Sequence, residues 1–401
     1  MPARHTLFAL ALALLASCRV PVHAPSVLKD PPAEATRGMA LPAAGLYDNS
    51  TSSPLFSMID GTTQTIDIAV YEMTDANVRS ALRRALARGV RVRVIKEPNP
   101  VDDRCNIFGP TPENARTDCD DEKKLRSEIL SSGGAFVPFR KSELCADPKK
   151  SCFMHGKMVI SDGRALLVST GNFNPTNLCD LPLKPSRCNR DFTVIIREPK
   201  TINFFGQIFE RDLSQKSYDL AALIQTYGVD SKVTVSPLSL DPLLRFIHSA
   251  QKSLLIHHQY LKDPSLNSAI VEAASRGVRV QVTLASLCSF GPPSPGERRR
   301  ATEIFSEFDQ AGVSIRMVPS RFRIGGKPGY MHAKAMIADG QSAWVGSVNG
   351  STASLTNNRE FGVFFDHKEW ISALSEVMTK DHLSQDTETW KESLDCAFDS
   401  F

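Results

Sequence analysis

Two segments of the sequence repeat one pattern of side chains that could do chemistry. Residues 154–163 read MHGKMVISDG and residues 331–340 read MHAKAMIADG. Both segments place Lys two residues after His, and Asp-Gly after four further residues. An imidazole can act as a nucleophile or as a proton carrier, and an ammonium group can hold an anion. The residues concerned are His155, Lys157 and Asp162 in the first copy, and His332, Lys334 and Asp339 in the second.

Further polar residues follow each motif at matching places. Asn172 and Asn349 each stand ten residues after the Asp of their motif. Asp191 and Glu360 then stand in matching Asn-Arg-acid-Phe tetrapeptides. One His-x-Lys motif could arise by chance, but two copies with the same later residues indicate a shared purpose. Paired His, Lys and Asn suit a tetrahedral phosphate with free oxygens.

The residues around each motif predict the strands that position these side chains. After each His the chain enters an apolar run, which predicts a strand, and residues i and i+2 of a strand share a face. His and Lys of each copy should therefore project together. The Gly after each Asp predicts a hairpin turn. The returning strands, expected at 165–169 and 343–346, bring both Asn residues back to the end where His stands.

The motifs belong to a longer internal repeat. Residues 66–94 align with residues 254–282 at an offset of 188 without a gap. Each segment reads as a strand, a helix with an Asp N-cap, a Gly and a second strand. This spacing is typical of βαβ units in a mostly parallel sheet. We therefore expect a duplicated α/β fold, with one half at 43–230 and the other at 231–401.

The first residues predict export rather than a folded element. A basic start precedes a short apolar run that ends in small residues, which is typical of a secretory signal. Leu15–Cys18 resembles a bacterial lipobox, so we expect a signal peptide at 1–17 and a lipidated Cys18 as the mature N-terminus. Cleavage after Ala24 is the alternative. Residues 18–42 are rich in Pro and predict a flexible tether. We therefore expect an exported protein, either an outer-membrane lipoprotein or a periplasmic or secreted protein.

Cysteine usage agrees with export. Of the nine cysteines, all but Cys18 should form disulfides, because their number is even and none lies in the tight pairs of a zinc site. Many pairings are possible. Sequence proximity favours 105–119, 145–152 and 179–188, which leaves 288–396. The first three pairs lie where the first half is longer than the second, which predicts stapled loops at the rim of the site or, alternatively, surface decoration.

The overall composition excludes several classes of protein. The chain has 401 residues, of which 42% are hydrophobic and 23% are charged, as in ordinary globular proteins and unlike disordered, collagenous or coiled-coil chains. Its 47 Lys and Arg against 44 Asp and Glu give a net charge of +3, which does not favour a polyanionic partner.

Three other features are expected to have structural rather than catalytic or binding roles. His257 and His258 lie on the repeated strand, and we expect core or rim histidines rather than catalytic ones. The basic run Arg298–Arg300 precedes apolar residues at helical spacing, which favours a solvated helix face over a rim that binds headgroups.

With its double motif, the sequence resembles the phospholipase D superfamily over nearly all of residues 43–401. The resemblance implies two pseudo-twofold-related halves, each a mostly parallel mixed sheet flanked by helices. It implies a single active site at their interface, with one His, Lys and Asn from each half. No metal or cofactor is expected, because the cations are lysines and the nucleophile is a neutral imidazole.

The same resemblance implies a role for each motif residue. His155 attacks phosphorus and forms phosphohistidine, while His332 protonates the departing alcohol and then deprotonates water or an acceptor alcohol. Asp162 and Asp339 organise the site by hydrogen bonds. Asp191 and Glu360 orient the imidazoles, either in their own half or in the other. The nonbridging oxygens are held by Lys157, Lys334, Asn172 and Asn349.

The expected function is an exported phosphodiesterase of phospholipase D type, which hydrolyses phospholipid at a membrane surface to phosphatidic acid and a headgroup alcohol. One alternative is transfer to an alcohol, as in cardiolipin synthases of the same superfamily. Another is a metal-independent endonuclease, but near-neutral charge makes nucleic acid the less favoured partner. A binding module is least favoured, because neither motif has lost a member. We expect a monomer.

Overall fold

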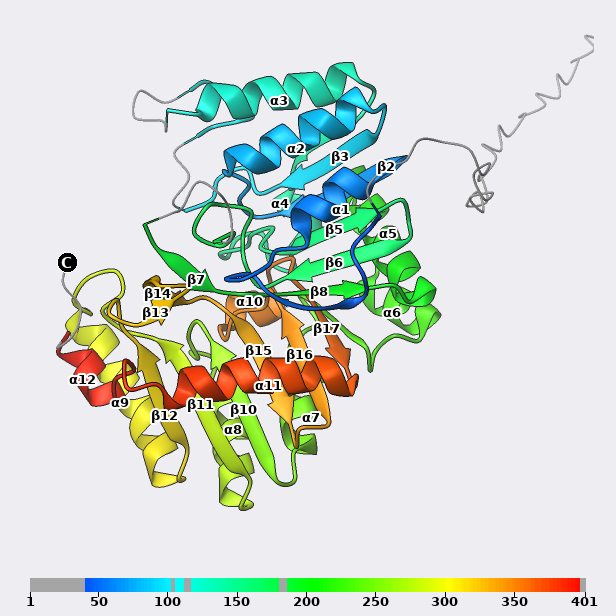
Figure 1. Cartoon of the computed structure of the whole chain (residues 1–401). Helices are drawn as coiled ribbons and strands as arrows, with labels where there is room; N and C mark the ends of the chain where they lie inside the picture. Colours follow the sequence, from blue (N-terminus) through cyan, green and yellow to red (C-terminus); the bar gives the residue numbers. More distant parts are fainter. Residues whose placement is uncertain (1–39, 102–104, 112–116, 180–185, 397–401) are drawn as a thin grey trace, which may run out of the picture. The chain divides into compact units, whose positions relative to one another are not determined.

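The computed structural model describes residues 40–101, 105–111, 117–179 and 186–396 (Figure 1). The expected signal peptide, Cys18 and nearly all of the tether lie outside the described residues. Within the described part, no helix is both long enough and apolar enough to cross a membrane.

A seven-stranded mixed sheet forms the first half, in the order β1-β8-β6-β5-β2-β3-β4. The predicted βαβ unit is present, because β2 and β3 are parallel and α2 (Ala76–Ala87) connects them. Asp75 caps α2 as expected, since its carboxylate accepts the backbone N–H groups of Asn77 and Val78. The strands are β1 (Gly45–Asp48), β2 (Thr65–Val70), β3 (Arg91–Lys96), β4 (Ala135–Pro138), β5 (Lys157–Ser161), β6 (Ala165–Ser169) and β8 (Phe192–Ile196).

A second seven-stranded sheet repeats this plan, in the order β12-β11-β10-β15-β16-β17-β9. Asp263 caps α8 (Pro264–Ser275), the counterpart of α2. The strands are β9 (Val233–Val235), β10 (Ser253–His258), β11 (Arg279–Ala285), β12 (Ser314–Val318), β15 (Lys334–Ala338), β16 (Ser342–Gly346) and β17 (Phe361–Phe365).

Both sheets are mixed, but they contain fewer parallel pairs than expected. Only β2-β3-β4 and β10-β11-β12 are parallel, and every other neighbouring pair is antiparallel. The physical reason lies in the motifs themselves. Each motif strand ends in an Asp-Gly turn with both residues at positive φ, and the chain returns at once as a hairpin.

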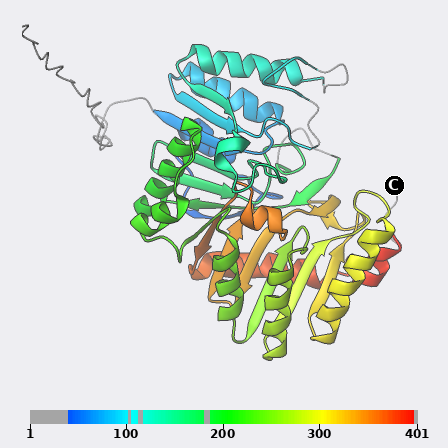
Figure 2. The ribbon, with the colours of Figure 1, turned by 180° about the vertical axis from the view of Figure 1, so that it is seen from behind.

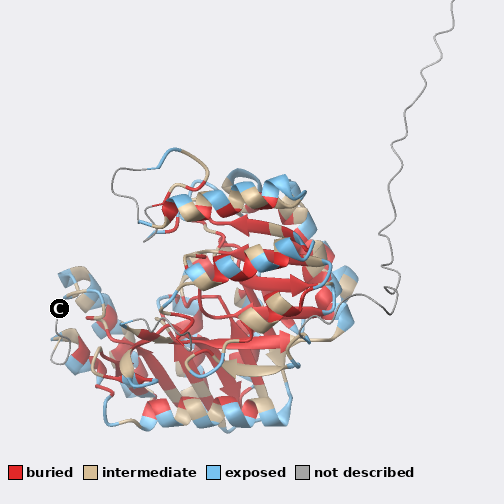
Figure 3. Ribbon diagram, turned by 45° about the horizontal axis from the view of Figure 1, so that its top comes forward, coloured by how far each residue is buried: buried red, intermediate tan, exposed pale blue. Residues whose placement is uncertain are grey.

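Helices cover both faces of each sheet. In Figures 1 and 2, α11 crosses one face of the second sheet, and α7, α8 and α9 lie on the other. Figure 3 shows the sheets buried and the outer helix faces exposed. The remaining helices are α1 (Leu55–Gly61), α3 (Cys119–Ser131), α4 (Lys141–Leu144), α5 (Pro199–Ser214), α6 (Leu220–Tyr227), α7 (Leu240–Ser249), α9 (Pro295–Gln310), α10 (Thr352–Thr356), α11 (Lys368–Leu383) and α12 (Trp390–Leu394).

A small third sheet joins the two halves. It contains β13 (Arg323–Ile324) and β14 (Lys327–Met331) from the second half and β7 (Cys188–Arg190) from the first, and β14 runs parallel to β7. The counterpart contact is a parallel bridge between Met154 and Arg359. The residues just before each motif His therefore pair with the tetrapeptide of the other half.

The four expected disulfides are confirmed. They are Cys105–Cys119, Cys145–Cys152, Cys179–Cys188 and Cys288–Cys396.

Gly156 gives a test of the packing at the junction of the halves. A Cβ at Gly156 would overlap the ring of Phe361, which comes from the other half. We predict that Gly156→Ala lowers the free energy of unfolding by about 1–3 kcal/mol, because the ring must move within a packed core. Gly206 in α5 is the matched control. Nothing lies within 4 Å of a Cβ there, so Gly206→Ala should raise stability by about 0.5–1 kcal/mol. Urea denaturation of both variants checks the prediction, and an unchanged midpoint for Gly156→Ala contradicts it.

Candidate active site

The two motif histidines meet at one cavity of about 530 Å³. His155 and His332 both line it, as do Asn172 and Asn349. Each motif thus contributes an imidazole and an amide to the same space, as the sequence predicted. The two halves build one site rather than two.

His155 is held by residues of the second half. Its backbone N–H donates to the carbonyl of Arg359 over 2.9 Å, immediately before β5. Its ring Nδ1 lies 2.8 Å from Oε2 of Glu360. The other carboxylate oxygen of Glu360 accepts the side-chain amide of Asn358 over 3.0 Å. The acid that orients His155 therefore comes from the opposite half.

His332 is held in the same way by residues of the first half. Its backbone N–H donates to the carbonyl of Arg190 over 3.3 Å. Its Nδ1 lies 2.9 Å from Oδ1 of Asp191. The carboxylate of Asp191 also accepts the hydroxyl of Thr170 over 2.6 Å and the amide of Asn177 over 2.5 Å. The sequence left open which His each acid serves, and the structure shows that both acids serve the other half.

This pairing decides which ring nitrogen is available for chemistry. A carboxylate beside Nδ1 favours the tautomer with its proton there, which leaves the lone pair on Nε2. Burial is the largest influence on the imidazoles and lowers the pKa of both His155 and His332 to about 4. The neighbouring lysines lower these pKa values, while Glu360 and Asp191 raise them. Both rings are therefore neutral near pH 7, as a nitrogen nucleophile requires.

The two acids keep their negative charge despite being buried. Burial by itself raises the pKa of Glu360, but its interactions with His155, including a hydrogen bond, and with Lys157 bring the pKa below its ordinary value. The same balance holds for Asp191, whose pKa is lowered by its interactions with His332, including a hydrogen bond, and with Lys334.

The motif lysines are buried directly beneath the imidazoles. Lys157 Nζ donates to the carbonyl of His155 over 2.5 Å and lies 3.1 Å from that residue's Nδ1. Lys334 Nζ donates to the carbonyl of His332 over 2.5 Å and to that of Thr170 over 3.3 Å. Burial lowers the pKa of both ammonium groups, that of Lys334 to about 8. The charge of Lys334 therefore depends on pH just above neutrality.

That pKa predicts the alkaline side of the activity profile. The free protein loses the charge of Lys334 as pH rises through about 8, and with it one partner of the negative transition state. We predict that kcat/KM for a soluble diester, bis(p-nitrophenyl) phosphate, falls above about pH 8. Arginine stays charged, so Lys334→Arg should lose this decline whatever its absolute rate. A wild-type profile that stays flat to pH 10 contradicts the prediction.

The amides of Asn172 and Asn349 line the cavity, and both leave a buried oxygen without a hydrogen-bond partner. Asn172 Nδ2 lies 3.3 Å from Oε2 of Glu72. Asn349 instead lies close enough to Tyr260 to influence the pKa of its hydroxyl. Glu72 and Tyr260 align at the offset of 188, so the two copies hold their Asn from equivalent positions. The unpartnered oxygens are suited to hydroxyl groups of a ligand.

Asp162 and Asp339 do not lie in the cluster, which corrects the expectation that they organise the site. Asp162 follows the far end of β5, roughly 20 Å along the chain from His155 by strand rise. Its carboxylate accepts the backbone N–H groups of residues 63–65, and Asp339 does the same for residues 251–253. Each Asp thus ties the hairpin turn after its motif strand to the backbone at the start of a neighbouring strand, β2 or β10.

Two buried arginines of the tetrapeptides join the halves, a role that the sequence did not suggest. Arg190 pairs with Asp381 of α11 over 2.6 Å. Arg359 pairs with Asp212 of α5 over 3.0 Å. Each Arg thus reaches a helix of the opposite half and fixes the backbone that precedes the orienting acid.

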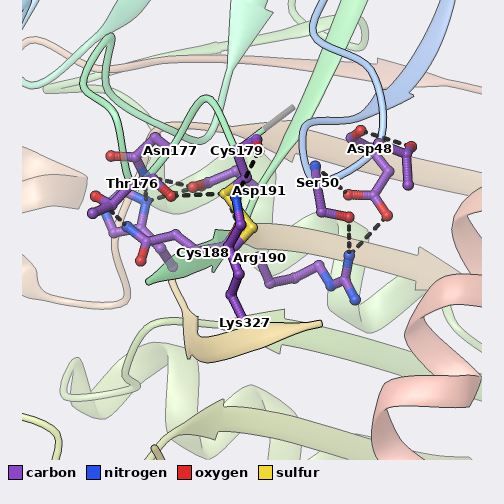
Figure 4. The surroundings of a disulfide bond; sticks show 12 residues. Asp48, Ser50, Thr176, Asn177, Cys179, Cys188, Arg190, Asp191 and Lys327 are labelled. Atoms are coloured by element: carbon purple, nitrogen blue, oxygen red, sulfur yellow. Dashed lines mark hydrogen bonds and ion pairs between the residues drawn. A yellow bond between two sulfur atoms is a disulfide. The ribbon is translucent and has the colours of Figure 1, made fainter. Parts of the chain in front are cut away.

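The disulfide between Cys179 and Cys188 lies beside the second orienting acid (Figure 4). Cys188 begins β7, which leads directly to Asp191, and the segment tied to it carries Asn177. Lys327 of β14 donates to the carbonyl of Cys179 over 3.1 Å. The segment that leads to Cys179 therefore lies at the cavity, where Thr176 and Asn177 form part of the lining.

Other side chains of the cavity wall could not be singled out from the sequence. The ring of Tyr71 packs against His155 with centroids 4.9 Å apart, and that of Tyr330 lies 6.3 Å from His332. Tyr71 ends the repeated strand, but Gln259 stands at the equivalent position of the second copy. The repeat therefore did not indicate that Tyr71 belongs to the site. By contrast His257 and His258 are core residues as expected, since both are buried and neither lines the cavity.

Comparisons with known proteins show which family and which relatives this chain resembles. The family described as "Cardiolipin synthase, PLD-like domain" matches residues 55–213 and 243–382. Cardiolipin synthase A of Proteus mirabilis (strain HI4320) is 31% identical over 150 residues, which are 36% of this chain and 28% of that protein. Cardiolipin synthase of Listeria monocytogenes serotype 4a (strain HCC23) is 28% identical over 141 residues, 35% and 27% of the two chains. The matches span only about a quarter of these relatives.

Among solved structures, phosphatidylserine synthase of Haemophilus influenzae Rd KW20 superposes with a TM-score of 0.58 at 15% identity, over 89% of this chain and 90% of that one. This likeness shows a shared fold over nearly the whole length.

Proposed function

We propose a phosphatidyl-transfer function for this chain, which belongs to the phospholipase D superfamily through the family of cardiolipin synthase PLD-like domains. The reaction replaces the headgroup alcohol of a phospholipid by another alcohol. The observation that carries the proposal is the pair of imidazoles at one cavity, each with Nδ1 beside a carboxylate.

In the first step, Nε2 of His155 attacks phosphorus. The bond from phosphorus to the headgroup oxygen breaks, and His332 gives that oxygen a proton from its own Nε2. The products are a phosphatidyl group bonded to His155 and a free headgroup alcohol. Lys157 and Lys334 balance the negative charge that gathers on the nonbridging oxygens.

This step needs one proton on the pair of imidazoles. In the free protein both rings are neutral near pH 7, because burial lowers the pKa of each to about 4. A bound phosphodiester brings a negative charge to the cavity, and a nearby negative charge raises the pKa of an imidazole. One ring can then carry the proton for the leaving group while the other stays neutral and attacks.

In the second step, the neutral His332 takes the proton from an acceptor hydroxyl. The acceptor oxygen bonds to phosphorus, and the bond between phosphorus and Nε2 of His155 breaks. Water as the acceptor gives phosphatidic acid, and an alcohol gives a new phospholipid. Two observations support an alcohol: the curated relatives are named as synthases, and the cavity offers unpartnered amide oxygens for ligand hydroxyls.

The test supplies phosphatidylethanolamine vesicles, glycerol and EDTA to the oxidised protein. The proposal predicts phosphatidylglycerol as the main product, formed by wild type and not by His155→Ala. If phosphatidic acid is the sole product, the enzyme is a hydrolase and the transfer proposal is wrong. Supercoiled DNA in a parallel reaction tests the nuclease alternative, which nicking without lipid turnover would establish.

We also propose that the enzyme acts after export, in an oxidising compartment. The four disulfides support this, because such bonds persist outside the reducing cytosol. Mass spectrometry of the mature N-terminus tests the expected start at a lipidated Cys18, and an intact leader contradicts it.

A further inference from the structure

A second cavity opens beside the catalytic one. It has a volume of about 410 Å³ and shares four lining residues with the catalytic cavity. These are Gln259, Tyr260, Phe290 and Tyr330. Gln259 Nε2 donates to the hydroxyl of Tyr330 over 2.9 Å, and Tyr330 is in turn near His332. The second cavity therefore continues directly from the place where the phosphate is expected.

Apolar side chains from two elements form the walls of this cavity, which we call the side groove. From α9 come Ala301, Ile304 and Phe305, which share one helix face by their spacing. From the end of β11 and the loop after it come Leu284 and Leu287. Charged groups are also present in its lining, namely Lys262, Glu297 and Arg300.

The loop that forms one wall is fixed in place. Cys288 is bonded to Cys396, and the backbone N–H of Leu287 donates to the hydroxyl of Ser393 over 2.7 Å. Both partners belong to the segment around α12. The groove is thus held open by covalent and hydrogen bonds, which lowers the entropy cost of binding a flexible ligand.

The rim of the two cavities carries the most exposed large apolar side chains of the described residues. Phe290 is 81% exposed and lies between the two cavities, with its ring 5.2 Å from that of Tyr330. Val101 is 75% exposed and lines the catalytic cavity from the other half. Apolar groups at such a rim are suited to contact with lipid.

We infer that the side groove binds an acyl chain of the phospholipid whose phosphate lies between His155 and His332. The inference rests on the proposed function and identifies a further part of the substrate that the enzyme binds. A sugar or nucleotide would gain little from these walls, whereas each methylene that leaves water contributes about fourfold in affinity. Continuity with the catalytic cavity places the chain on the same molecule as the reacting phosphate.

The experiment uses phosphatidylethanolamines with two acyl chains of four, six or seven carbons, at concentrations where they are dissolved singly. Release of ethanolamine reports the first chemical step. For wild type, kcat/KM should rise several-fold with each added methylene that reaches the groove. For Ala301→Phe, which fills the groove, the ratio of the seven-carbon to the four-carbon value should fall at least tenfold.

Thr302→Phe is the matched control, because Thr302 is the next residue of α9 and faces solvent. It should keep the wild-type ratio. If Ala301→Phe does not fold, Leu287→Asn replaces it and makes the wall polar. Equal kcat/KM for all chain lengths in wild type overturns the inference and leaves the proposed function intact. Absence of turnover for every lipid, with bis(p-nitrophenyl) phosphate still cleaved, overturns the proposed function as well. If kcat/KM depends on the acyl-chain length of an added acceptor lipid but not on that of the donor phospholipid, the groove does not bind the donor and the inference is overturned.

Discussion

His332→Ala protein should release one equivalent of p-nitrophenol from a p-nitrophenyl ester of phosphatidic acid and then stop, whereas His155→Ala protein should release none. The nitrophenolate leaves without a proton, so the first step needs the nucleophile and not the acid. The second step needs a base for the acceptor hydroxyl, and His332→Ala has lost it. This difference follows from the two separate roles assigned to imidazoles at one cavity.

On phosphatidylethanolamine both variants should lose activity by about 10³–10⁴-fold or more, because the natural leaving group does need a proton. His248→Ala is the control, since His248 lies at the surface with 46% of its side chain exposed. Rapid-quench measurement of nitrophenol gives the first turnover. Equal bursts from both variants would contradict the division of roles.

Replacing the orienting acids should have the next largest effect. Glu360→Gln removes the carboxylate that lies 2.8 Å from Nδ1 of His155. An amide can bond either tautomer, so the lone pair is no longer directed to Nε2. We predict a loss of about 10²–10⁴-fold in kcat. Asp191→Asn should cost a similar factor through His332.

The imidazole tautomers give a readout that general damage to the fold would not imitate. In ¹⁵N spectra, Glu360→Gln should change the tautomer signals of His155 and leave those of His332 in place. Asp191→Asn should do the reverse. This test also distinguishes the cross-half pairing from pairing within a half. Signals that change in the same half as the substituted acid would refute the pairing.

The sequence pattern predicted the individual strands, helices and disulfides. Contacts between segments far apart in the sequence determine how these elements form the site. The gapless repeat from residue 66 located both βαβ units. Sequence proximity led to three of the disulfides and left Cys288 and Cys396 as the fourth pair. The alternation around each motif placed His and Lys correctly. Apart from the pair Cys288–Cys396, which remained by elimination, these predictions depend on residues close together in the chain or on the repeat itself.

The cross-half exchange could not be predicted in this way. It depends on the parallel pairing of β14 with β7 and on the bridge between Met154 and Arg359. Neither contact leaves a periodic signal, because each joins short segments far apart in the sequence. The motif Asp residues misled for a related reason. Their constant spacing from His suggested that they organise the site, but Asp162 binds backbone N–H groups at the other end of the strand.

The central claim is that His155 becomes covalently bonded to phosphorus at a site built by both halves. The most direct measurement incubates His332→Ala protein with the p-nitrophenyl ester of phosphatidic acid, quenches it at alkaline pH and maps the adduct by mass spectrometry of peptides. The account predicts one phosphatidyl group on the peptide that contains His155. An adduct on another residue, or complete nitrophenol release with no adduct on the protein, would contradict it.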